Sequence, residues 1–168
     1  MIIGRGDIAA ALRDANYRSE TVYFAAGVSN SQETRETEYQ REIDLLRRQP
    51  RDQRLVYFSS LCVFYLQSRY AQHKLYAESF IKQWFPRYCI VRIGNITWGS
   101  NPHTLINTLR AAEAPVIRPV YRYVVDRAEF LYWINMIPAF NCELNIPGRR
   151  MLVEDIYREF VLAERETA

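Results

Sequence analysis

Tyr70 and Lys74 are the residues of this chain whose types and spacing most directly indicate chemistry. They lie four positions apart in the segment SRYAQHKLYAESF, and this spacing places two side chains on one face of a helix, one turn apart. A tyrosine hydroxyl ionises near pH ~10 and is a poor base at neutral pH, but a nearby ammonium stabilises the phenolate and lowers its pKa. The pair therefore predicts a tyrosine that acts as a base with the help of a lysine.

Lysine is rare in this sequence, which makes Lys74 more informative. The chain has 22 lysines and arginines, of which only Lys74 and Lys82 are lysines. An ammonium on a flexible stem can hold a ribose diol, whereas the planar fork of arginine favours carboxylates and phosphates. Chance is the alternative explanation, because a chain with 12 tyrosines can produce a Tyr-x-x-x-Lys spacing from its composition alone.

Two serines end a predicted strand shortly before this pair. The apolar run in QRLVYFSS (53–60) is continuous, which is typical of a parallel strand buried on both faces, and it ends at Ser59 and Ser60. Ligands of parallel α/β sheets gather at the carboxyl ends of strands. A serine hydroxyl there could hydrogen-bond the oxygen whose proton Tyr70 removes, which is the geometry of general acid–base catalysis.

The first turn of the chain has a glycine pattern that suits a phosphate. IIGRGDIA places Gly4, Gly6 and Ala9 as GxGxxA between a predicted strand and a predicted helix. In a dinucleotide-binding unit the first glycine permits the tight turn, and the second lets the backbone approach a diphosphate at the helix N-terminus. Glycines that serve only as turn residues are the alternative. No acid follows the second predicted strand before Glu33, so the residue that usually binds the adenosine ribose is missing.

Strands and helices alternate along the whole chain. Short apolar runs predict strands at 1–3, 21–26, 53–60, 88–93, 120–125 and 142–146, and the segments between and after them predict helices at 8–15, 31–48, 67–85, 102–113, 126–137 and 153–164. Ser31 is the expected N-cap of the second helix. This alternation predicts an α/β fold, one domain over residues 1–168, with a mainly parallel sheet and helices on both faces.

The composition argues against several other classes of protein. A chain of 168 residues with 49% hydrophobic residues can bury a core. No apolar run approaches the ~20 residues of a membrane span, and the N-terminus lacks the order of a signal peptide, so a cytoplasmic location is expected. Three cysteines and two histidines show no metal-ligand spacing, so we expect no metal site. A net charge of +3 with mixed signs does not favour a nucleic-acid partner.

Taken in order, these motifs resemble those of the short-chain dehydrogenase/reductase superfamily, in particular its extended group of NAD-dependent nucleotide-sugar epimerases and dehydratases. IIGRGDIA is similar to the glycine-rich turn, and VYFAAGVSNS to the strand that passes beneath the cofactor. LVYFSSLCVF resembles the strand with the catalytic serine, and SRYAQHK the YxxxK motif. VRIGNITWG is similar to the Arg-x-x-Asn segment, which places Asn95 near the substrate diphosphate or the nicotinamide.

The resemblance implies an NAD(P)-binding Rossmann-like domain in which Ser60, Tyr70 and Lys74 are catalytic. Tyr70 would be the base, Lys74 would lower its pKa and hold the nicotinamide ribose, and Ser60 would orient the reacting hydroxyl. The implied cofactor is NAD or NADP, and the implied substrate is a nucleotide-sugar or a related small molecule with a hydroxyl or carbonyl group. The implied cofactor contacts are Gly4, Arg5, Gly6, Asp7, Ile8, Ala25, Ala26, Gly27, Lys74 and Asn95.

The chain departs from this family in its length, which is about half that of a usual member. Only residues 4–20 separate the first two predicted strands, which leaves room for one crossover helix. We therefore expect the family's second and third strands to be lost, strand 1–3 to form a sheet edge, and the substrate side to be reduced to about residues 96–168. A catalytically inactive relic that binds a nucleotide or a protein partner is the alternative to an enzyme.

The resemblance also implies a homodimer. The helices predicted at 31–48 and 67–85 correspond to those that pack into a four-helix dimer interface in the family. Their apolar residues suit that role, namely Tyr39, Ile43, Leu75, Phe80 and Trp84. The alternative for each of these residues is that it faces the sheet of its own domain.

Overall fold

A five-stranded parallel sheet organises the protein, which a computed structural model describes over residues 1–15, 18 and 20–166. Its strand order is β1-β2-β3-β4-β7, and every neighbouring pair is parallel. The strands are β1 (Ile2–Ile3), β2 (Thr21–Phe24), β3 (Arg54–Ser60), β4 (Tyr88–Ile93) and β7 (Cys142–Ile146). The predicted parallel sheet is therefore confirmed, and so is the position of the first strand at a sheet edge.

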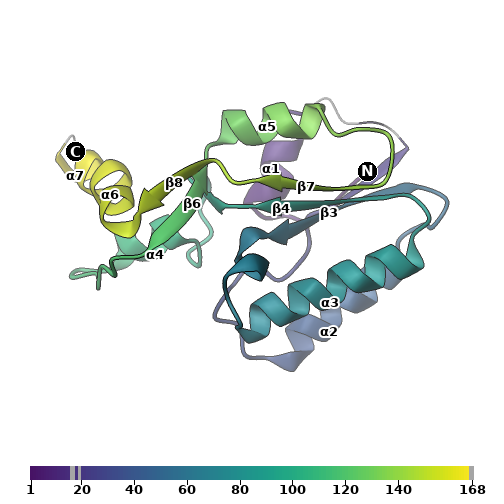
Figure 1. Ribbon diagram of the computed structural model, residues 1–168, viewed down its shortest axis with the longest axis horizontal. Helices are drawn as coiled ribbons and strands as arrows, with labels where there is room; N and C mark the ends of the chain where they lie inside the picture. Colours follow the sequence, from purple (N-terminus) through teal and green to yellow (C-terminus); the bar gives the residue numbers. More distant parts are fainter. Residues whose placement is uncertain (16–17, 19, 167–168) are drawn as a thin grey trace.

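Helices cover both faces of this sheet, as predicted (Figure 1). On one face lie α1 (Asp7–Leu12) and α5 (Arg127–Asn135), and on the other lie α2 (Glu36–Arg47) and α3 (Arg69–Trp84). The side chain of Asp126 caps α5 by accepting a hydrogen bond from the Glu129 amide. The helices thus form the outer two of three layers, with the sheet between them.

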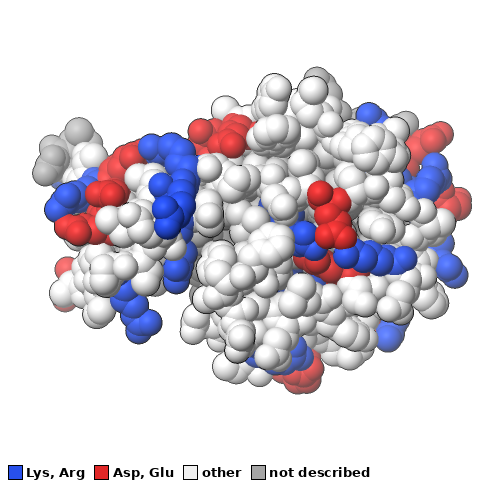
Figure 2. Space-filling view, in the orientation of Figure 1, with Lys and Arg blue, Asp and Glu red and all other residues white. Residues whose placement is uncertain are grey.

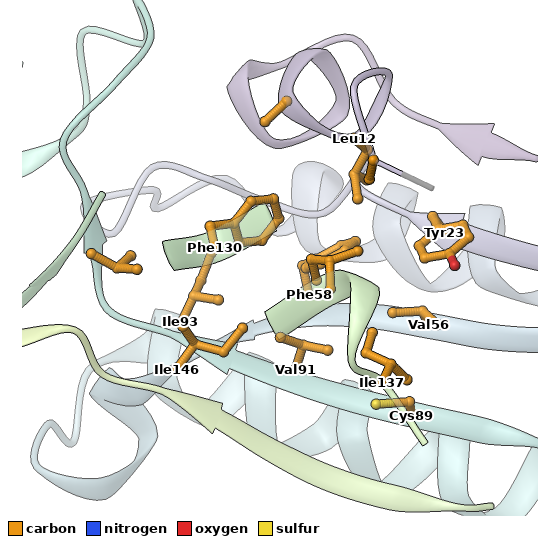
Figure 3. Packing of buried hydrophobic residues seen from close by; sticks show 14 of the residues in the cluster. Leu12, Tyr23, Val56, Phe58, Cys89, Val91, Ile93, Phe130, Ile137 and Ile146 are labelled. Carbon is orange, nitrogen blue, oxygen red and sulfur yellow. The ribbon is translucent and has the colours of Figure 1, made fainter. Parts of the chain in front are cut away.

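The core is divided between the two faces of the sheet. Phe58 of β3 and Phe130 of α5 pack with their ring centroids 5.9 Å apart, and Leu12, Tyr23 and Val91 belong to the same cluster (Figure 3). On the opposite face a second cluster joins the sheet to α2 and α3 through Phe24, Tyr57, Ile43, Leu46, Ile81 and other buried residues. Strand β3 is buried from Arg54 to Ser59, as its continuous apolar run predicts.

The register brings the carboxyl ends of the strands to one edge of the sheet. Ile3 pairs with Phe24, and the last residue of β3, Ser60, pairs with Ile93 of β4. The loops that follow β1, β2 and β3 therefore leave the sheet side by side. This edge carries most of the residues to which the sequence assigns chemistry.

A second, smaller sheet lies beside this edge (Figure 1). Its strands, in spatial order, are β5 (Asn95–Ile96), β6 (Tyr121–Val125) and β8 (Arg149–Leu152). Helices α4 (Leu105–Ala111), α6 (Val153–Tyr157) and α7 (Ala163–Glu166) accompany it, with a π-helical turn at Arg158–Leu162 between the last two. The sequence predicted only β6, because β5 has two residues and β8 begins with two arginines, neither of which resembles an apolar strand.

The chain passes between the two sheets at two glycines. Gly94 separates β4 from β5, and a Cβ there would lie 2.9 Å from the Tyr123 carbonyl oxygen. Gly148 lies between β7 and β8 with a φ of +65°, and its Cβ would overlap the Val124 carbonyl oxygen. Only glycine fits so close to the β6 backbone, so these two positions hold the smaller sheet against the main one.

Helix α2 begins later than predicted. Its first residue is Glu36 with Arg35 at the N-cap position, so the prediction that Ser31 caps this helix was wrong. The carboxylate of Glu33 accepts hydrogen bonds from the backbone N–H groups of Thr34 and Arg35. Such local side-chain-to-backbone bonds compete with helix formation, which explains the delayed start.

The charges on the viewed face are mixed in sign. Figure 2 shows basic and acidic side chains interspersed over this face, with basic groups most prominent over the end that carries β8 and α6. Within the described ranges, no helix is both long and apolar enough to cross a membrane.

We predict that Phe130→Ala destabilises the protein by about 3–5 kcal/mol, because the ring is fully buried between α5 and the sheet and its removal leaves a cavity. Denaturation by urea, followed by tryptophan fluorescence, measures the change. Tyr132→Ala on the same helix is the matched control: that side chain is 58% exposed, and its truncation should cost much less. Equal losses for the two variants would contradict the packing described for α5.

Candidate active site

Helix α3 presents Tyr70 and Lys74 at the edge where the strands end. The helix begins at Arg69, because the Ser68 hydroxyl accepts a hydrogen bond from the Ala71 amide and caps its N-terminus. Tyr70 therefore lies in the first turn, and Lys74 lies one turn later on the same face. The Lys74 Nζ atom is 5.5 Å from the centre of the Tyr70 ring, so the predicted pair is close in space.

Ser60, the last residue of β3, lies beside Tyr70. Its hydroxyl accepts a hydrogen bond from the Cys62 amide at 3.2 Å, which caps the short 3₁₀ helix Leu61–Phe64. Tyr70 packs in one buried cluster with Cys62, whose amide this hydroxyl binds, and the Ser60 side chain acts to lower the Tyr70 pKa. The structure therefore brings the three residues of the predicted catalytic set together.

The protonation of Tyr70 differs from the prediction. Burial raises the Tyr70 pKa well above its ordinary value, the Cys62 thiol and the Glu42 carboxyl raise it further, and the Ser60 side chain acts in the opposite direction. Lys74 is not among these causes, so its predicted role in lowering the Tyr70 pKa stays a prediction. The Lys74 ammonium has another partner.

Lys74 is buried and paired with an acid that the sequence did not suggest. Its side chain is 2% exposed, and its Nζ atom lies 3.1 and 3.5 Å from the two carboxylate oxygens of Glu42. Nζ also donates a hydrogen bond to the Tyr57 hydroxyl at 3.1 Å. The ammonium therefore has two polar partners inside the protein, and its charge is compensated there.

Glu42 is the centre of this buried network. Its carboxylate accepts hydrogen bonds from the Val28 amide at 2.7 Å and the Tyr57 hydroxyl at 2.6 Å, and His73 Nε2 lies 3.0 Å from it. Burial alone would raise the Glu42 pKa, but Lys74, His73, Tyr57 and the Val28 amide together lower it well below its ordinary value. Glu42 is therefore ionised at neutral pH.

Sequence reasoning missed Glu42, Tyr57 and His73 as members of this centre. A signal for Glu42 existed: the buried stripe of α2 consists of Tyr39, Glu42, Ile43 and Leu46, so a charged residue lies among apolar ones at helical spacing. An acid within such a stripe requires a buried partner. No comparable signal marked the hydroxyl of Tyr57, which lies inside an apolar strand.

The glycine-rich turn and the segment after β2 connect with this centre. Gly4 has a φ of +131°, and a Cβ there would overlap the Ala25 carbonyl oxygen, so the turn packs directly on the segment Ala25–Gly27. A Cβ on Gly27 would lie 2.7 Å from Glu42 Oε1 and 2.8 Å from Lys74 Nζ. The backbone at Gly27 therefore closes over the buried ion pair.

The remaining predicted cofactor residues lie along the same edge. Arg5 and Gly6 are exposed, and Asp7 and Ile8 are partly buried. Asp7 accepts hydrogen bonds from the amides of Ser100 and Asn101, at 3.1 and 3.0 Å, which fixes the loop after β5 over the start of α1.

Asn95 is engaged with the smaller sheet. It lies in β5, and its side-chain amide donates a hydrogen bond to the Tyr123 carbonyl oxygen at 2.9 Å. This bond fixes the amide against β6, and the predicted role of Asn95 near a diphosphate or nicotinamide stays a prediction.

A second buried carboxylate ties α3 to the sheet. Glu78 accepts a hydrogen bond from the Ser59 hydroxyl at 2.6 Å and two from the Arg92 guanidinium, at 2.9 and 2.6 Å. Arg92 also contacts Glu143 of β7 at 2.5 Å. Ser59 therefore serves this structural network, which leaves Ser60 as the serine of the candidate site.

A nicotinamide dinucleotide fits this edge in part. Above Gly6 nothing lies within 4 Å of an added Cβ, so a diphosphate has room to approach the backbone. The end of β2 carries no acid that could bind the adenosine ribose. Lys74 is paired with Glu42, so its ammonium does not face a site for the nicotinamide ribose. Among the described residues, no cluster of three metal-ligating side chains occurs.

Sequence comparison alone identifies no relative, since no family model and no curated protein matches this chain. Solved structures do match. The Bordetella bronchiseptica enzyme WbmG, in complex with NAD and UDP, is similar over 83% of this chain, with a TM-score of 0.63 at 13% identity. The B. bronchiseptica enzyme WbmH, in complex with NAD⁺, matches 89% with a TM-score of 0.63 at 14% identity. UDP-glucose 4-epimerase of Thermus thermophilus, in complex with NAD, matches 89% with a TM-score of 0.60 at 15% identity.

The chain spans little more than half the length of these proteins. It covers 54% of WbmG, 60% of WbmH and 62% of the T. thermophilus epimerase. At such low identity the likeness shows the fold, and it confirms the predicted Rossmann-like α/β architecture.

We predict that Gly4→Ala destabilises the protein by about 2 kcal/mol or more, because φ is positive and the new methyl group meets the Ala25 carbonyl. Gly6→Ala is the control, since its methyl group meets nothing within 4 Å. Thermal unfolding followed by circular dichroism should separate the two variants. A loss for Gly6→Ala as large as that for Gly4→Ala would refute the turn geometry.

Acid should destabilise the protein through Glu42. Its pKa is lowered on folding, so the stabilisation is complete above the ordinary carboxyl pKa of 4.5 and is lost as the pH falls below it. We expect Glu42→Gln to lower the free energy of unfolding by about 3–5 kcal/mol at pH ~7, because it leaves the Lys74 charge unpaired. Between pH ~5 and ~3 the free energy of unfolding should fall less in this variant than in the wild type. Urea unfolding at each pH measures both effects.

Glu36→Gln is the matched control on the same helix. Glu36 pairs with Arg69 at the surface, and exposed pairs contribute little to stability. A variant of Glu36 that changes the acid response as strongly as one of Glu42 would show that the buried carboxylate is not the dominant group.

Proposed function

We propose that this chain is the nicotinamide-dinucleotide-binding domain of an NAD(P)-dependent epimerase/dehydratase-like protein that acts on a nucleotide-sugar or a related hydroxyl or carbonyl compound. The observation that carries the proposal is the convergence of Ser60, Tyr70 and Lys74 at the carboxyl edge of a parallel sheet, next to the turn at Gly4 and Gly6. The complexes of WbmG, WbmH and the T. thermophilus epimerase with NAD support the choice of cofactor.

Ser60 and Tyr70 have different roles at the reacting oxygen of the substrate. Ser60 lies half-buried at the end of β3 and orients that oxygen by a hydrogen bond. Tyr70 retains its proton at neutral pH because its pKa is raised, so it donates the proton to a carbonyl oxygen more readily than it accepts one from a hydroxyl. A nicotinamide, when bound, would supply or accept the hydride.

The residues that would hold the cofactor are those of the first turn and of the segment after β2. The backbone at Gly6 would face the diphosphate, with Arg5 exposed beside it. Ala25–Gly27 would form the floor of the site between the turn and the reaction centre. NAD and NADP are both compatible with this arrangement, since no acid at the end of β2 selects a free ribose hydroxyl.

A catalytically inactive module that binds a nucleotide or a protein partner is the second candidate. The ion pair of Lys74 with Glu42 favours it, because the lysine is not free to bind a ribose or to activate Tyr70. The missing adenosine acid favours it as well. The same fold would then be retained for binding alone.

A homodimer through the outer faces of α2 and α3 remains part of the proposal. Leu75 and Trp84 are 48% and 39% exposed on α3, as an interface would require. Tyr39 and Ile43 of α2, by contrast, are buried in the protein's own core.

We expect NADH and NADPH to quench the tryptophan fluorescence of the wild-type protein in a saturable way. Gly6→Trp should abolish this binding, because the indole fills the open space over the turn. Tyr70→Phe should retain cofactor binding and lose turnover by about 10²-fold or more, because only the proton donor is removed. Conversion of UDP-galactose in the presence of NAD⁺, followed by NMR, measures turnover.

The outcomes separate the two candidates. Saturable binding with turnover in the wild type supports the enzyme. Binding that is saturable but without turnover of UDP-galactose or UDP-glucose favours the inactive module. If millimolar NADH or NADPH gives no saturable binding, the proposed cofactor site is wrong.

A further inference from the structure

We propose that Glu42 is a positioning residue of the reaction centre, which holds Lys74 as a buried counter-ion so that its charge acts on neither the Tyr70 hydroxyl nor a bound ribose. The geometry is specific. Both carboxylate oxygens of Glu42 lie within 3.5 Å of Lys74 Nζ, and neither side chain is more than 2% exposed. The role of Lys74 in the reaction rests on the proposed function, whereas the ion pair does not.

Elements packed from several directions define the surroundings of Lys74. Helix α2 contributes Glu42, and β3 contributes the Tyr57 hydroxyl at 3.1 Å. The 3₁₀ helix contributes the Cys62 thiol, and α3 contributes Tyr70. His73 of α3 contacts Glu42, and Glu78 lies one turn after Lys74 on the same helix. Of these groups Glu42 is the carboxylate in contact with the ammonium, whereas Glu78 is paired with Arg92.

The backbone closes the pair from the side of the cofactor edge. At Gly27 even a methyl group would approach Glu42 Oε1 and Lys74 Nζ to 2.7 and 2.8 Å. A ribose on the outer side of this segment is therefore separated from Nζ by the chain itself. Lys74 reaches a ligand only if the Glu42 contact breaks or the segment Ala25–Gly27 moves.

The consequence for Tyr70 follows from the charges. An isolated ammonium beside a phenol would stabilise the phenolate, but the ionised Glu42 carboxylate cancels that effect and itself opposes a second negative charge. Tyr70 accordingly keeps its proton. If the charge of Glu42 is removed and Lys74 is kept, the ammonium should act on Tyr70 again.

The scarcity of lysine allows a direct test on the unmodified protein. With ¹⁵N-lysine labelling, only Lys74 and Lys82 give side-chain ammonium signals in an NMR spectrum. We expect one signal, absent from Lys74→Met, to exchange its protons with water more slowly than Lys82 by on the order of tenfold or more. Equal exchange rates would overturn the proposal, and both rates are measured on the wild-type protein.

A double-mutant cycle tests the effect on Tyr70. The ionisation of Tyr70 is followed with ¹³Cζ-labelled tyrosine, and its signal is assigned by comparison with Tyr70→Phe. In Glu42→Gln the Tyr70 pKa should fall by about one unit or more, whereas Glu42→Gln combined with Lys74→Met should not show this fall. Glu42→Asp, which keeps the charge, should restore most of the wild-type behaviour.

The results are interpretable without any cofactor. A Tyr70 pKa that is unchanged in a folded Glu42→Gln variant, or a fall that persists without Lys74, would overturn the positioning role. If Glu42 had a purely structural role, Glu42→Gln would lower stability with and without Lys74→Met. The change in the Tyr70 pKa would then not depend on Lys74. Failure to bind NADH would contradict the proposed function and leave these measurements standing.

Discussion

A single buried carboxylate holds the centre of this molecule together. Glu42 receives hydrogen bonds from the segment after β2, from β3 and from α3, while it belongs to α2 itself. A carboxylate without partners at such a depth would neutralise or disrupt the fold, so each donor must be in place for the others to be stable. The positions of Lys74 and of the floor at Gly27 both follow from this arrangement.

A second carboxylate repeats the principle on the neighbouring strands. Glu78 joins α3 to Ser59 of β3 and to Arg92 of β4, and Arg92 extends the network to Glu143 of β7. Helix α3 is thus attached to the sheet by two ionic networks as well as by apolar packing. In the proposed function, this attachment would fix the distance between the Tyr70 hydroxyl and the oxygen that accepts its proton.

Much of this structure could be predicted from the sequence, and the exceptions have physical reasons. The apolar runs predicted six strands in a mainly parallel sheet, and the lost strands predicted an edge at β1. Five of these strands form the main sheet, whereas the sixth, β6, pairs in the smaller sheet instead. The proximity of Ser60, Tyr70 and Lys74 followed from their positions at a strand end and on one helix face. The partner of Lys74 could not be predicted, because Glu42 lies 32 residues away in the sequence and an ion pair between distant residues leaves no local sequence pattern. The start of α2 was missed because the Glu33 side chain competes for backbone N–H groups.

The all-parallel pairing of the main sheet also constrains how the chain can fold. No pair of neighbouring strands can form as a hairpin, so each pairing requires a crossover connection. At one edge of the sheet Ile2 pairs with Tyr23, and at the other edge Cys89 lies beside Cys142, which is 53 residues later in the chain. High contact order of this kind slows folding, and the chain leaves the sheet after β4 and returns only with β7. The smaller sheet begins within that excursion, because β5 and β6 lie between β4 and β7 in the chain, whereas its third strand, β8, follows β7.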